Sequence, residues 1–310
     1  MIQLHPLMAI LGLPPWSEFQ PFVVSGLALG GVYALSGVGM VVLYRSTGVL
    51  NLSFGATGAL GALVGWQLIN SSGFGFWPAY IVCILLGGVV TLAYGLVFGR
   101  ALAGRDPLVK ATASLGLTLI LLGVMDLLWT SNGGASRAIQ FPTDSNSFSV
   151  GSVDVTYTEV IGLVVGIGIT VVTGAFLRLT KLGTAMRAMA SDREATAMLG
   201  VPVRLVEANA WFVSGCLSGV AGFLLADLVA LDAATLTFLV ISSVAAALIA
   251  RLSSITVTFV AAIVIGVVDA MATPIQSLSN YRDMTPFVLA AVALLVLNRR
   301  RVISVSRTGI

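Results

Sequence analysis

Long apolar stretches, separated by short polar or charged segments, run along almost the whole chain. A helix of about 20 apolar residues crosses a bilayer, because each residue adds about 1.5 Å to a hydrocarbon path of about 30 Å. The pattern therefore predicts about nine spans, over residues 21–44, 51–69, 77–99, 111–130, 157–178, 205–228, 234–250, 255–272 and 284–298. The last stretch is short for a full crossing, so eight or ten spans also fit the pattern.

Composition assigns the chain to the membrane proteins. Of its 310 residues, 57% are hydrophobic and only 9% are charged, whereas soluble domains carry about 25% charged residues. We therefore expect an all-α polytopic membrane protein with a single transmembrane domain over residues 1–310. One histidine, His5, and two cysteines in apolar runs, Cys83 and Cys216, argue against a catalytic centre, a metal site and a disulfide framework. Nucleic-acid binding is also not expected, because no basic face with interleaved aromatic residues is present.

The positive charges predict an orientation in the membrane. Cytoplasmic loops carry an excess of Lys and Arg. With nine spans and an inner C-terminus, only Arg137 and Arg282 of the 16 Lys and Arg fall on the outer side. We therefore expect the N-terminus outside and the C-terminus in the cytoplasm.

Glycines recur at a spacing of four residues within the predicted spans, and such pairs let helices approach closely in lipid. The pairs are Gly26/Gly30, Gly61/Gly65, Gly95/Gly99, Gly162/Gly166 and Gly215/Gly219. Membrane helices are rich in glycine generally, so the pairs favour tight packing without indicating a function.

One long connection, over about 131–156, lies on the predicted outer side. It is polar, and its second half alternates like a short pair of strands around Gly151. We expect an extracytoplasmic loop whose second half forms a short pair of strands.

The long connection on the predicted inner side, over about 179–204, reads GTAMRAMASDREATAMLGVP from Gly183. Its Ala, Met, Arg and Glu residues are good helix formers. The sequence predicts two short helices, over roughly 184–190 and 192–199, joined at Ser191.

Local signals mark the ends of these two helices. Ser191 and, three residues later, Glu194 fit a capping box, and Gly200 followed by Pro202 supplies a stop. The insert is too short to fold alone. It must therefore rest on the ends of its own spans, on lipid headgroups, or in a groove of a soluble partner.

Several segments resemble one family. The loop and its continuation RLVEANAWFVSGCLSGVAGFLLA from Arg204 closely resemble the permease subunits of ABC importers for branched-chain amino acids. Three further segments are similar to that family: GLALGGVYALSGVGMVVLYRSTGVLNLSFGATGALGA from Gly26, ATASLGLTLIL from Ala111 and YRDMTPFVLAAVALLV from Tyr281. Two departures are the absence of the family's histidine from Asn51-Leu52-Ser53-Phe54-Gly55, and Ala250-Arg251-Leu252-Ser253-Ser254 in place of a G-G-x-G-S turn.

The resemblance implies the ABC importer permease fold in a bacterial inner (plasma) membrane. It implies three kinds of partner: a second homologous permease subunit, two ATP-binding subunits that carry ATP and Mg, and an extracytoplasmic solute-binding protein. Related importers carry branched-chain amino acids, amides, urea or aromatic acids. The chain lacks G-x-x-x-x-G-K-[ST], so we expect no cofactor and no enzyme activity in this subunit.

The inner loop, about 179–204, is the expected point of coupling to the ATP-binding subunits. Polar contacts are assigned to its charged residues, and the apolar contacts to its Met and Leu residues, since flexible Met side chains suit an adaptable interface. The coupling residues are Met186, Arg187, Met189, Asp192, Glu194, Leu199 and Gly200.

Polar side chains on apolar spans are the candidates for the translocation path. They are Asn51, Ser53, Thr57, Thr112, Ser114, Thr118, Ser214, Ser218 and Asp126. Ser and Thr also bond back to their own helix, so part of this set has a structural alternative. Asp126, Glu159, Asp227 and Asp269 fall near the predicted outer ends of spans, where they either form an acidic vestibule or simply lie at the membrane surface.

Two other classes of protein remain as alternatives. A self-sufficient secondary transporter or channel usually has ionisable residues near the membrane centre, and the acids here lie at predicted outer ends. A membrane enzyme would need convergent nucleophile, base or metal ligands, and the single histidine argues against it.

Overall fold

The computed structural model describes residues 16–102, 104–129, 139, 141, 147–150, 153–229, 231–275, 284–285, 287–293 and 295. His5, Arg137, Gly151, Arg282 and the residues after 295 lie outside the described residues. So does most of the outer connection before residue 147.

The described part of the chain is mostly helical, and each predicted span up to residue 272 corresponds to one helix. The elements are α2 (Trp16–Thr47), α3 (Phe54–Ser72), α4 (Phe76–Leu102), α5 (Pro107–Trp129), β1 (Ser147–Val150), β2 (Val153–Thr156), α6 (Tyr157–Leu179), α7 (Lys181–Ser191), α8 (Arg193–Met198), α9 (Val203–Leu228), α10 (Ala233–Ile249) and α11 (Ile255–Met271). Residues 287–293, within the last predicted span, are helical.

Five of the described helices are long and apolar enough to cross a membrane: α2, α4, α5, α6 and α9. Helices α10 and α11 are apolar but have 17 residues each. The fold is thus a polytopic helical bundle, as predicted.

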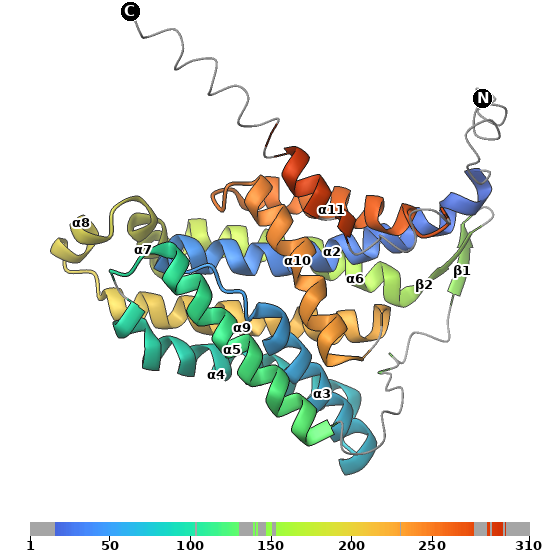
Figure 1. Cartoon of the computed structure of the whole chain (residues 1–310), viewed down its shortest axis with the longest axis horizontal. Helices are drawn as coiled ribbons and strands as arrows, with labels where there is room; N and C mark the ends of the chain where they lie inside the picture. The colour runs from blue at the N-terminus through green and yellow to red at the C-terminus, as the bar shows by residue number, and fades with distance from the viewer. Residues whose placement is uncertain are drawn as a thin grey trace, which may run out of the picture.

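Helix α2 is the centre of the bundle and runs along its length (Figure 1). Val32, Tyr33, Ala34 and Leu35 are consecutive and fully buried, so all faces of this helix are covered by protein. A helix that is apolar on every side is expected in such a position. Helices α6, α9 and α11 pack around it.

Glycines form the closest helix contacts, and four of the five predicted pairs take part in them. Gly26 and Gly30 of α2 lie against α11 around Gly266. Gly162 and Gly166 of α6 face α2, whereas Gly61/Gly65 and Gly215/Gly219 line contacts with α4. In the fifth pair Gly95 lies against Trp211, but Gly99 has open space beside it.

The two long connections lie at opposite ends of the bundle (Figure 1). At one end, β1 and β2 form an antiparallel pair in which Phe148 is opposite Val155, which confirms the predicted strands. At the other end, α7 and α8 form the predicted pair of short helices. We call this the α7–α8 end.

The joint between the short helices differs from the prediction. Ser191 is the last residue of α7 and its hydroxyl contacts the carbonyl of Arg187. Asp192 is the N-cap of α8, and its Oδ1 accepts from the N–H of Ala195 at 2.9 Å. The predicted Ser191–Glu194 capping box is therefore wrong, because aspartate, an equally good N-cap residue, starts α8 one residue later.

Candidate functional site

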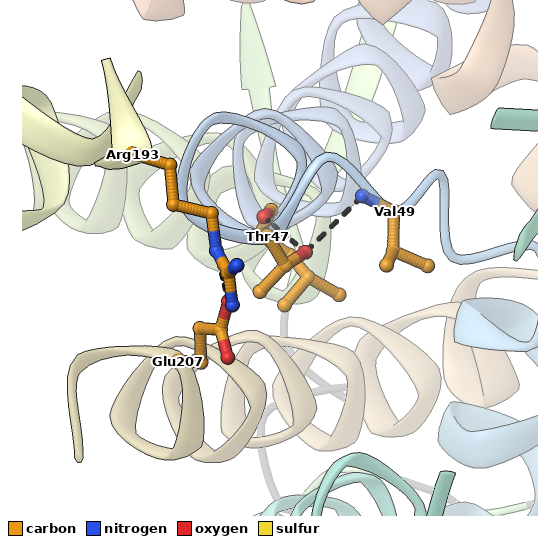
Figure 2. Close-up of polar contacts among 5 residues, drawn as sticks. Thr47, Val49, Arg193 and Glu207 are labelled. Atoms are coloured by element: carbon orange, nitrogen blue, oxygen red, sulfur yellow. Dashed lines mark hydrogen bonds and ion pairs between the residues drawn. The ribbon is translucent and has the colours of Figure 1, made fainter. Parts of the chain in front are cut away.

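The α7–α8 insert is held by caps and by one ion pair. The hydroxyl of Thr180 accepts from the N–H of Gly183 at 2.9 Å and starts α7. Helix α8 has only six residues, too few to be stable alone. Figure 2 shows Arg193 of α8 reaching across to Glu207 of α9. Both the Nε and an Nη of Arg193 donate to Oε1 of Glu207, at 3.0 and 2.8 Å.

Buried side chains add a second attachment. Met186 and Met189 of α7 are buried in a cluster with Val42 and Leu177, and Thr196 of α8 is buried as well. The two methionines therefore anchor the insert to its own bundle. The large apolar side chains left outside are Met198 and Leu199, each 83% exposed.

The other expected coupling residues lie on the surface of the insert. Arg187, Asp192 and Glu194 are exposed. Gly200 has φ of +81° and ends the insert in the left-handed conformation that favours glycine. Sequence reasoning missed Glu207, because its partner is fourteen residues away on another helix and no local spacing links them.

The polar residues before α3 come together with those of α5 and α9. Oδ1 of Asn51 accepts from the N–H and Oγ of Ser53, at 3.0 and 2.6 Å. Oγ of Ser114 accepts from the N–H of Leu52 at 3.0 Å. Oγ of Ser218 donates to the carbonyl of Phe54. These bonds hold the connector between α2 and α3 in place.

Two polar atoms in this region have no hydrogen-bond partner among the residues that the structure describes. Nδ2 of Asn51 and Oγ of Ser214 are buried without a hydrogen bond, and leaving such a group unpaired costs about 1–3 kcal/mol. By contrast, Thr57, Thr112 and Thr118 each donate to the carbonyl four residues earlier. Thr112 is also exposed, so it does not lie with the others.

Three of the four expected acids have structural partners, and the fourth, Asp126, has no hydrogen bond to another described residue. Asp126 of α5 is exposed and lines a cavity of about 430 Å³ with Asp232 and Leu63. Glu159 forms a capping box with Thr156. Oδ1 of Asp227 accepts from the N–H of Phe141 at 3.1 Å. Asp269 is buried and accepts from the hydroxyl of Tyr33 at 3.3 Å, so its place is inside the bundle and not at its surface.

Among the described residues, no group of three or more His, Cys, Asp or Glu side chains could hold a metal ion. Cys83 is buried and its Sγ donates to the carbonyl of Gly61 at 2.9 Å. The polar residues of the described bundle therefore position helices and line cavities.

Known proteins resemble the chain over most of its length. LivH from Salmonella typhimurium, a high-affinity branched-chain amino acid transport system permease protein, is 24% identical over 295 residues, which cover 90% of this chain and 94% of LivH. BraD from Pseudomonas aeruginosa, described in the same words, is 24% identical and covers 91% of this chain and 95% of its own. LivM from Salmonella typhimurium is 28% identical over 63% of this chain and 50% of LivM.

No solved structure matches the chain. A family model described as "Branched-chain amino acid transport system / permease component" matches residues 22–297. This range contains α3 to α11, the α7–α8 insert and all but the first turns of α2. The chain therefore belongs to the family of permease components of branched-chain amino acid transport systems.

Proposed function

We propose that the chain forms half of the translocation path of an ATP-driven importer for a branched-chain amino acid or a related small polar or organic-acid solute. Its single transmembrane domain receives the solute from an extracytoplasmic binding protein. Two ATP-binding subunits supply the energy, with ATP and Mg bound to them. The attachment of the α7–α8 insert is the observation that supports this reading most directly.

One face of the insert packs on the bundle, and the other is exposed. Met186, Met189 and Thr196 fix it to the bundle. Met198 and Leu199 are exposed at the end of α8, and Asp192 and Glu194 are exposed at its start. An exposed apolar tip next to fixed charges suits a helix that enters a groove of a soluble partner. Movement of that partner would reach α9 through the ion pair of Arg193.

A second permease subunit would complete the path. LivH and LivM of Salmonella typhimurium are two different permease proteins of one organism, and both are similar to this chain. We propose that the partner covers α5. This helix exposes Leu119, Ile120, Leu127 and Leu128 together with the carboxylate of Asp126, and a charge is costly against lipid. A protein interface with a water-filled path accommodates both.

If the solute is an amino acid, Asp126 is the proposed contact for its ammonium group, and the cavity of about 430 Å³ beside it is large enough for such a solute. Asn51 and Ser214 offer a buried amide and hydroxyl without partners. The remaining candidates, Ser53, Thr57, Thr112, Ser114, Thr118 and Ser218, already have hydrogen-bond acceptors or donors in the bundle.

The proposed setting is a bacterial inner membrane, with the α7–α8 end in the cytoplasm and the β1–β2 end outside. Tagging the two ends of the chain and testing their accessibility in intact cells would measure this orientation. An accessible C-terminal tag in intact cells would contradict it.

Co-purification from the native organism tests the assignment as a whole. We expect a second permease, an ATP-binding protein and, after crosslinking, an extracytoplasmic binding protein. Uptake into proteoliposomes should require all of them and ATP. Accumulation against a gradient by the purified chain alone would instead establish the alternative, a self-sufficient secondary transporter.

A further inference from the structure

A cavity of about 800 Å³ at the α7–α8 end is lined by three arginines and, among the residues that the structure describes, by no carboxylate. Arg45 comes from the end of α2, Arg178 from the end of α6, and Arg187 from α7. Arg187 contacts the hydroxyl of Thr184 on its own helix at 3.4 Å. The one ion pair among the described residues is that of Arg193 and Glu207, so the positive charge of this cavity is not neutralised within the described bundle.

A helix terminus adds to this charge. Ser253, Ser254, Ile255 and Thr256, at the start of the 17-residue helix α11, line the same cavity. Oγ of Ser254 caps the N–H of Val257, while the first N–H groups of a helix have no partner within the helix. Helix N-termini attract anions through these groups and the helix dipole. Two independent features therefore select a negatively charged occupant.

The rest of the wall is mostly apolar and follows α6 away from Arg178, over side chains that are exposed on the bundle. Ile167 and Val171 of α6 and Phe259 of α11 line the cavity, and Val171 is 63% exposed. Ile167 precedes Arg178 by eleven residues, or roughly 16 Å along a helix. This length matches the hydrocarbon depth of one leaflet, about half of 30 Å.

We propose that this cavity binds one anionic phospholipid, with its phosphate between Arg45, Arg178 and Arg187 and an acyl chain along α6 and α11. Basic pockets between helices at the membrane surface bind such headgroups. Free phosphate would leave the apolar wall in water. An acidic segment of a soluble partner would likewise leave that wall in water, and the exposed tip at Met198 and Leu199, which is proposed to enter a partner's groove, does not line this cavity.

The test uses the full-length chain purified in detergent. Native mass spectrometry measures binding of phosphatidylglycerol and of phosphatidylcholine with identical acyl chains. We expect one phosphatidylglycerol bound at least tenfold more tightly than phosphatidylcholine. Since a cation near the lipid surface changes affinity about fivefold, Arg178→Gln should weaken it about fivefold, and Arg45→Gln with Arg178→Gln about thirtyfold.

The matched control is Lys110→Gln with Arg204→Gln. It removes two cations from a separate cavity at the same end and should leave the preference for phosphatidylglycerol unchanged.

Equal binding of the two lipids, or equal loss of affinity in both double variants, would overturn the proposal. Displacement of the lipid by inorganic phosphate would indicate a free-phosphate site instead. Unchanged lipid preference in the Arg45/Arg178 variant, with weakened retention of ATP-binding subunits, would indicate a protein contact instead. Arg178 is exposed, so its single variant should fold even if the double variant does not.

Discussion

Removing the ion pair between α8 and α9 should impair coupling while leaving the fold intact. Arg193 and Glu207 are 49% and 21% exposed, and such partly exposed pairs contribute about 0.2–1 kcal/mol. Glu207→Ala should therefore lower the melting temperature by at most about 2–4 °C. A loss of the same free energy would lower the population of the observed orientation of the six-residue helix α8, relative to other orientations, by up to about fivefold.

The assay is solute imported per ATP hydrolysed, in proteoliposomes that contain the partner subunits. We expect up to about a fivefold drop for Glu207→Ala and for Arg193→Ala, with ATP hydrolysis retained. The double variant should be no worse than either single variant, because both remove the same contact. Asp106→Ala, an exposed carboxylate at the same end without an ion pair to a described residue, is the control. Additive losses, or an equal drop in the control, would refute the reasoning.

Three further pairs of variants probe other features. Because φ of residue 200 is +81°, Gly200→Val should destabilise this turn by about 1–2 kcal/mol and reduce the retention of ATP-binding subunits in a pull-down. Gly200→Asn should retain them, because asparagine tolerates this conformation. Asp126→Asn should lower uptake severalfold. Asp227→Asn should not, because its amide oxygen still accepts the hydrogen bond from the N–H of residue 141. Equal uptake by the two variants would favour a surface role for Asp126. Gly222→Val should prevent the protein from accumulating in the membrane, because the added Cβ would overlap the backbone of α3. Gly168→Val, which has open space beside it, should accumulate to the normal level, as measured on a blot of membrane fractions.

Apolar length and local spacing were enough to predict the helices, the strand pair and the two-helix insert. They also indicated the glycine contacts, because small residues at a spacing of four form a continuous stripe on one face. Local spacing failed at the start of α8, where two adjacent residues, Ser191 and Asp192, are both good caps. The side chains of Met186 and Met189 point inward because they pack on the apolar surface of α2 and α6. The sequence of the insert alone does not show this contact.

The sites were less predictable than the fold, since they depend on contacts between distant segments. Asp126 and Asp227 have similar apolar neighbours in the sequence. They differ in the structure because the backbone of Phe141 approaches Asp227 and donates a hydrogen bond to it. The cavity of Arg45, Arg178 and Arg187 brings together the ends of α2 and α6, helix α7 and the start of α11, which no periodicity along one segment relates.

The enclosed position of α2 has a consequence for biosynthesis. Its seam with α11 joins Gly26 to Gly266, residues separated by 266 − 26 = 240 positions. A helix that leaves the ribosome early therefore keeps one flank open to lipid until α11 has been translated. Nascent chains stopped before residue 255 should expose that flank, so quality-control proteases would meet an unfinished bundle and not a smaller stable one.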